Sequence, residues 1–118
     1  MSREPRLGGA IRVRVKLVGY LSQFSQPPYV DLECAVGDSL SKLIARLMDQ
    51  MGASFRQVTL DPFGNLHGGL EVILDGELQP ARELSTIILE KDSEVLLMPM
   101  ISGGAGSLQK NQMEAQSV

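Results

Sequence analysis

Few residues of this 118-residue sequence have the type and spacing that catalysis requires. His67 is the only histidine, so no second imidazole can share a metal ion or complete a catalytic triad with it. Cys34 is the only cysteine, and its place on the apolar side of an alternating segment favours a small core residue over a nucleophile. The sequence shows no glycine-rich phosphate loop and no converging pair of carboxylates. We therefore expect a protein that is not an enzyme and that binds no metal or cofactor itself.

One candidate reactive group needs no side chain. Glycine pairs occur at 8–9, 68–69 and 103–104, and only the last pair follows the final apolar segment. Backbone without side chains can enter a narrow active site that a Cβ atom would block. We therefore single out Gly104 as the residue whose main-chain carboxyl could react, with Gly103 as part of the arm that presents it.

Charge is distributed unevenly along the chain, whose net charge is −3. The first 16 residues contain one acid, Glu4, and five cations: Arg3, Arg6, Arg12, Arg14 and Lys16. Nucleic-acid binding needs a broad basic surface with aromatic stacking platforms, and no aromatic residue is interleaved with these cations. The pattern favours a solvated basic edge strand, and the acidic remainder of the chain favours a basic protein as the partner.

Length and composition favour one domain in a cytoplasmic protein. A chain of 118 residues leaves no room for a second core. A lone cysteine allows no intramolecular disulfide, and no apolar run approaches the roughly 18 residues of a membrane span. We expect a flexible lead over residues 1–9, an ordered domain over residues 10–104, and a polar, disordered tail over residues 105–118.

Alternating apolar and polar residues predict most of the strands. Residues 11–17 and 29–34 alternate strictly and are joined by a turn-prone stretch, which indicates a hairpin. Residues 70–74 predict another strand, which reverses at Asp75 and Gly76, a pair typical of a tight turn with positive φ angles.

One helix stands out between these strands. Asp38 or Ser39 can cap its first turn, and Gly52 stands where a left-handed residue would end it. Its apolar stripe contains Leu40, Leu43, Ile44, Leu47 and Met51. Residues 53–69 contain several glycines and a proline, so they predict a long connection with one short helical turn over residues 55–58.

The final apolar segment, residues 95–101, predicts a strand that ends near Pro99, because proline has no N–H for the ladder. Alternation places Val95 and Leu97 inward. The outward-facing residues are Leu96, Met98 and Met100. Exposed apolar side chains beside a flexible arm favour partner binding, and the alternative is that a long connection folds over them.

This order of elements predicts an α+β fold. Helices on one face of a small mixed sheet, with the first and last strands as central neighbours, describe a β-grasp, or ubiquitin-like, fold. We expect a sheet of about four to five strands with one main helix packed on one face.

Four segments carry a more specific signal in their order along the chain. They are residues 11–15 (Ile-Arg-Val-Arg-Val), 36–40 (Val-Gly-Asp-Ser-Leu), 72–77 (Val-Ile-Leu-Asp-Gly-Glu) and 94–104 (Glu-Val-Leu-Leu-Met-Pro-Met-Ile-Ser-Gly-Gly). Together they resemble the MoaD/ThiS ubiquitin-like sulfur carriers, a family that includes the small subunit of molybdopterin synthase. The resemblance covers roughly residues 10–104 and is more specific than any single segment.

The resemblance implies that the chain is a carried substrate. An E1-like enzyme that uses ATP would adenylate the Gly104 carboxylate, which would then become a thiocarboxylate that donates sulfur for molybdopterin or related biosynthesis. The large subunit of molybdopterin synthase would be a second partner. The chain departs from the family where Asp92 and Ser93 replace a Gly-Asp turn and where Met100 replaces a second proline.

The chief departure is the segment after the diglycine. An internal amide between Gly104 and Ala105 leaves no carboxylate to attack ATP, so a protease would first have to remove residues 105–118. A second hypothesis is a ubiquitin-like modifier joined through Gly104 to lysine amines of target proteins. A third is a β-grasp interaction module that never uses its terminus.

Overall fold

A computed structural model describes residues 9–100 of the chain. Its first two strands, β1 (Ala10–Leu17) and β2 (Tyr29–Ala35), pair antiparallel, with Val13 opposite Leu32, and confirm the predicted hairpin. The inward residues of both strands are buried, as the alternation predicts. The link between the strands is more ordered than expected, because it contains a 3-10 helix, η2 (Gly19–Phe24), that buries Leu21 completely.

The main helix, α1 (Leu40–Met51), has the predicted bounds and caps. The Ser39 hydroxyl accepts a 3.1 Å hydrogen bond from the Lys42 N–H, and Gly52 ends the helix with φ +93°. Met48, which is not part of the predicted stripe, is buried, whereas Met51 is only half-buried. The single turn expected after this helix is in fact a second helix, α2 (Ala53–Thr59).

The C-terminal half supplies three strands. In β3 (Leu70–Leu74) and β4 (Glu77–Gln79) the chain forms a tight hairpin, and the turn residues Asp75 and Gly76 have φ angles of 48° and 90°. A short 3-10 helix, η3 (Ala81–Glu83), interrupts the crossing that leads to β5 (Ser93–Pro99).

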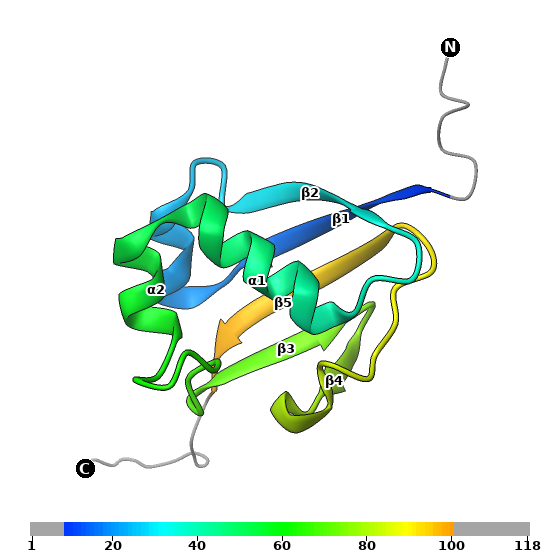
Figure 1. Cartoon of the computed structure of the whole chain (residues 1–118). Helices are drawn as coiled ribbons and strands as arrows, with labels where there is room; N and C mark the ends of the chain where they lie inside the picture. The colour runs from blue at the N-terminus through cyan, green and yellow to red at the C-terminus, as the bar shows by residue number, and fades with distance from the viewer. Residues whose placement is uncertain (1–8, 101–118) are drawn as a thin grey trace.

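The five strands form one mixed sheet in the order β2-β1-β5-β3-β4. The first and last strands, β1 and β5, are parallel neighbours, with Val15 opposite Val95. The expectation of a basic edge strand is therefore wrong, because β1 lies between β2 and β5 and the edges are β2 and β4. Figure 1 shows β5 in the middle of the sheet, where its apolar inner face is covered by α1.

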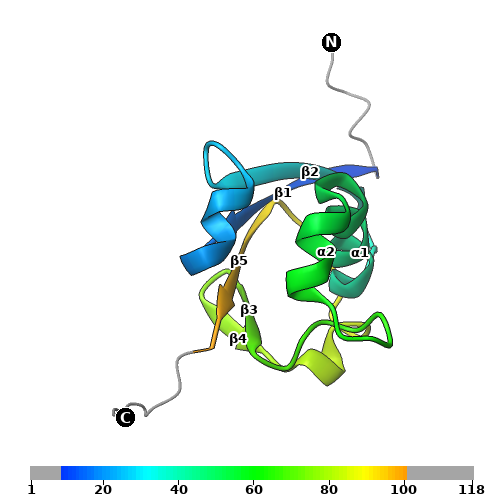
Figure 2. The same cartoon turned by 90° about the vertical axis from the view of Figure 1, so that its left-hand side faces the viewer.

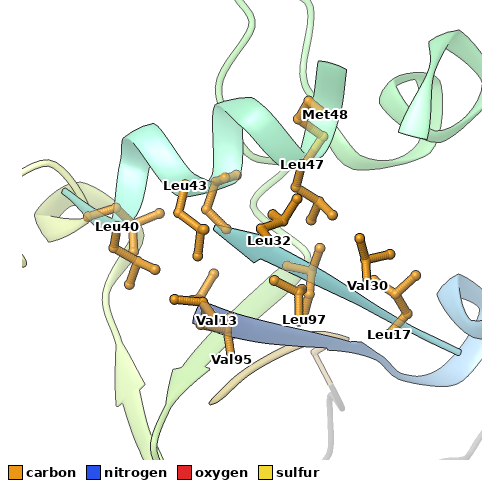
Figure 3. Packing of buried hydrophobic residues seen from close by; sticks show 14 of the residues in the cluster. Val13, Leu17, Val30, Leu32, Leu40, Leu43, Leu47, Met48, Val95 and Leu97 are labelled. Atoms are coloured by element: carbon orange, nitrogen blue, oxygen red, sulfur yellow. The ribbon is translucent and has the colours of Figure 1, made fainter. Parts of the chain in front are cut away.

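Both α-helices lie on the same face of the sheet (Figure 2). The stripe of α1 packs on the inner residues of the central strands, and the closest layer contains Leu43, Leu47, Val13, Val95 and Leu97 (Figure 3). Within residues 9–100, neither helix has the length and apolar content to cross a lipid bilayer. A mixed sheet with a helix across one face and parallel first and last strands is the α+β architecture of the β-grasp fold.

Candidate partner-binding surface

The end of β5 presents the residues that the sequence singles out for partner binding. Val95 and Leu97 are fully buried under α1. Leu96 and Met98 point to the other face of the sheet and are half-buried, and Met100 is 49% exposed. The alternation therefore places Leu96 and Met98 on the face that α1 and α2 leave uncovered (Figure 2), and Met100 follows directly after the end of β5.

Neighbouring strands extend this apolar surface. Leu96 is the register partner of Ile73 in β3, and Ile73 is in turn opposite Leu78 in β4, which is 59% exposed. Side chains that are directly opposite on one face of a sheet lie in contact distance. We call Leu96, Ile73 and Leu78 the outer apolar strip. Sequence reasoning missed Ile73 and Leu78, although the tight turn at residues 75–76 fixes the register that aligns them.

Two of the three cations of β1, Arg14 and Lys16, form ion pairs on the same face. Arg14 donates two hydrogen bonds to the Asp31 carboxylate, of 2.9 and 3.1 Å, and its guanidinium lies 3.9 Å from the ring centre of Tyr29. These hydrogen bonds lower the pKa of Asp31 and raise the pKa of Arg14. Lys16 pairs with Glu94 at 3.0 Å. Cross-strand acids therefore neutralise Arg14 and Lys16, which leaves the outer apolar strip as the main feature of this face.

Two hydrogen bonds fix the point at which the chain leaves the sheet, and Gly19 packs closely against Pro99 there. The Val18 N–H donates to the Leu97 carbonyl at 3.1 Å, and the Met100 N–H donates to the Gly69 carbonyl at 2.7 Å. The strand ends at Pro99, as predicted, and a Cβ atom on Gly19 would lie 3.1 Å from the Pro99 ring. Gly103 and Gly104 lie outside the described residues.

The single histidine and the single cysteine of the sequence both have structural roles. The Nδ1 atom of His67 accepts a 2.9 Å hydrogen bond from the Gly69 N–H, so it stabilises the loop before β3. Cys34 is buried in the core, and loss of hydration raises the pKa of its thiol. Among residues 9–100, no three His, Cys, Asp or Glu side chains gather in a way that could hold a metal ion.

The sequence matches no protein-family model, and no curated protein matches it. Solved structures do match the fold. Small archaeal modifier protein 1 from Haloferax volcanii superposes with a TM-score of 0.66 at 18% identity, covering 79% of this chain and 99% of that one. The same modifier from Methanosarcina acetivorans gives 0.65 at 20% identity, covering 82% and 100%. This chain has the ubiquitin-like β-grasp fold.

A candidate molybdopterin converting factor, subunit 1, from Pyrococcus furiosus is similar as well. Its TM-score is 0.57 at 14% identity, and the match covers 75% of this chain and 97% of that chain. The predicted β-grasp fold is thus confirmed by its own strand order and by these neighbours. Nearly the whole length of each neighbour is therefore matched by this chain.

Proposed function

We propose that this protein is the precursor of a cytoplasmic ubiquitin-like sulfur carrier. One observation carries the proposal most directly: the central strand β5 ends at Pro99, beside the outer apolar strip and five residues before Gly104. A β-grasp domain with an uncovered apolar face next to a glycine-ended arm can be held by a partner while the arm reaches that partner's active site. The similar folds of a modifier protein and of a candidate converting-factor subunit support the same role.

The reacting group in this proposal is the Gly104 carboxylate. A protease first hydrolyses the amide between Gly104 and Ala105 and releases residues 105–118. The new carboxylate then attacks the α-phosphorus of ATP on an E1-like enzyme, forming an acyl-adenylate and releasing pyrophosphate. Hydrosulfide attacks the acyl carbon, displaces AMP and leaves a thiocarboxylate, which supplies sulfur for molybdopterin or related biosynthesis.

This chain acts in these steps as substrate and not as catalyst. The adenylating partner supplies the nucleotide site and the metal ion that stabilises the phosphate charge. Leu96, Met98 and Met100, extended by Ile73 and Leu78, provide the surface that the E1-like enzyme and the large subunit of molybdopterin synthase use in turn. Methionine suits such a role because its flexible side chain adapts to more than one partner.

A second function uses the same arm for another acceptor. The two modifier proteins with a similar fold favour a role in which activated Gly104 is joined to a lysine amine of a target protein. The amine displaces AMP and forms an isopeptide bond. Adducts on target lysines would identify this function, whereas a free thiocarboxylate would identify the carrier.

The test is to charge a variant that ends at Gly104. With ATP, a sulfide source and an E1-like enzyme from the same cells, intact mass should show the exchange of one oxygen for sulfur. The full 118-residue chain should remain unchanged. Gly104→Val should fail, because a β-branched residue adds bulk and restricts the backbone where the arm must thread.

His67→Ala and Cys34→Ser versions of the shortened chain should still be charged, since neither side chain takes part in the chemistry. Charging that survives Gly104→Val, or that requires Cys34, would contradict the assignment. Intact mass of the protein from its own cells should also reveal a species that ends at Gly104. Finding only the full-length chain in cells that make the pathway's product would remove the mechanism.

A further inference from the structure

A groove of about 770 Å³ lies on the helix side of the domain, opposite to the outer apolar strip. Its walls are α1, Arg56 of α2, residues 60–66, and residues 81–85, which include η3 and the segment after it. Its lining includes five apolar residues: Ile44, Met48, Leu60, Leu66 and Leu84. Ala45 and Gly64 also border the groove, and their small size leaves it open. Such a hollow has the size of a typical binding pocket, and polar and charged residues border its apolar ones.

An exposed aromatic residue stands at the rim of this groove. Phe63 is 87% exposed, and its chain neighbour Gly64 is one of the residues that line the groove. The loop that carries Phe63 is ordered by Asp61, whose Oδ1 atom accepts hydrogen bonds from the N–H groups of Phe63 and Asn65, of 2.9 and 3.0 Å. A backbone bond of 2.7 Å from Asp61 to Asn65 closes the loop. Phe63 is therefore held in solvent by a preorganised loop, which lowers the entropy cost of burying it against a partner.

The rim of the groove also carries opposite charges. Asp49 and Arg82 both line it, and neither belongs to an ion pair within the part of the chain that the structure describes. Charges of both signs around an apolar groove allow a surface to face another copy of itself, because an acid of one copy can approach a cation of the other.

We propose that two copies of this chain associate about a two-fold axis, with Phe63 of each copy inserted into the groove of the other. Phe63 and the groove are next to each other in each copy. A two-fold axis close to them therefore forms the contact between Phe63 and the groove twice. The same symmetry pairs Asp49 of each copy with Arg82 of the other. Aromatic anchors that fill a preformed pocket contribute much of the binding energy at interfaces.

This dimer leaves the proposed carrier surface free. Residues of α1 line the groove, and Figure 2 shows that α1 lies on one face of the sheet. The outer apolar strips lie on the other face, so in the dimer they remain exposed to their partners. Self-association is measured by mass in solution and charging by sulfur incorporation, so either proposal can fail without the other.

The first experiment measures the mass of the full-length chain by sedimentation equilibrium. Between about 10 and 500 µM the average mass should rise from one chain toward two, because association follows concentration. Phe63→Ser should weaken the dimer roughly 100-fold or more, since symmetry removes two aromatic contacts at once. Tyr20→Ser is the matched control, because Tyr20 is 48% exposed and belongs to η2, which does not border the groove.

The second experiment fills the groove. Ala45→Arg places a long side chain over the apolar lining while keeping a good helix former, and it should weaken the dimer as much as Phe63→Ser does. Gln50→Arg, on the same helix but outside the groove, should have no effect. Circular dichroism should show that every variant keeps the wild-type fold.

The decisive test mixes the two variants. A Phe63→Ser chain has an open groove and an Ala45→Arg chain has an intact Phe63, so their heterodimer keeps one of the two insertions. The mixture should therefore associate more strongly than either variant alone. A wild-type chain that stays monomeric throughout, a Phe63→Ser chain that associates like wild type, or a mixture no stronger than its components would each overturn the proposal.

Discussion

The rings of Phe24 and Phe55 pack edge to face, with their centroids 5.3 Å apart and their planes at 83°. Phe24 ends η2, between the first two strands, whereas Phe55 lies in α2, which follows the main helix. Phe55 is fully buried. The pair therefore joins two short elements that lie far apart in the sequence and closes one end of the core.

Phe55→Ala should lower the free energy of unfolding by about 3–5 kcal/mol, because it removes a fully buried ring and leaves a cavity beside Phe24. Urea denaturation at neutral pH measures the change. Tyr20→Ala is the matched control, and the 48% exposure of Tyr20 predicts a much smaller loss. Equal effects of the two substitutions would show that the Phe55 ring does not support the core.

Arg14→Gln should raise the pKa of Asp31, whose carboxylate accepts the Arg14 hydrogen bonds. A lowered pKa in the folded state stabilises the fold above the unfolded pKa, and this contribution is lost as pH falls through the folded pKa. The variant should therefore lose stability at neutral pH and show a weaker decline in acid. NMR titration of the Asp31 carboxyl carbon measures the pKa, and Lys16→Gln, which breaks the pair with Glu94, should leave it nearly unchanged.

The Cys34 thiol should react slowly with an alkylating reagent in the native protein and rapidly in urea. Burial raises its pKa, so little thiolate forms at neutral pH, and the sulfur is also shielded by the core. Mass spectrometry follows the modification with time. A native rate that equals the rate in urea would place this thiol at the surface.

Met98→Asp should weaken binding of the E1-like enzyme at least tenfold, roughly the cost of removing one apolar contact residue at an interface. The side chain is half-buried on the outer face, so the fold should survive. Calorimetric titration measures the affinity, and Val36→Asp, a 43% exposed position outside this surface, serves as the control. Unchanged affinity would exclude Met98 from the interface, and unfolding would show that it belongs to the core.

The strands and the main helix could be predicted because their patterns are local. The alternation of residues 11–17, the capping by Ser39 and the tight turn at residues 75–76 each fix a conformation within a few residues. The order of the elements also predicted both neighbours of β1, namely its hairpin partner β2 and the last strand β5, whereas the cations of β1 wrongly suggested an edge position. Pairing with Asp31 on β2 and with Glu94 on β5 allows those cations to lie on an inner strand.

The short helices depend on contacts that no local pattern encodes. The α2 helix has only seven residues, and its N-cap residue is a glycine without a capping side chain, so its propensity is weak without the burial of Phe55 and Thr59. Thr59 completes its hydrogen bonding inside the helix, where its hydroxyl donates to the Phe55 carbonyl at 2.8 Å. The groove and the Ile73–Leu78 part of the outer apolar strip also arise only once distant segments have packed.

The end of β5 at Pro99 limits how far Gly104 can lie from the folded domain. The β5 strand ends at Pro99, and the Met100 N–H makes one further bond to the Gly69 carbonyl, so a count from Pro99 gives an upper limit for the distance that Gly104 can reach from the domain. Five residues of fully extended chain span at most about 17 Å. An enzyme that activates Gly104 while gripping the outer apolar strip must therefore place its nucleotide within that depth, and an insertion of two residues after Pro99 would let the carboxylate overshoot the site by up to about 7 Å.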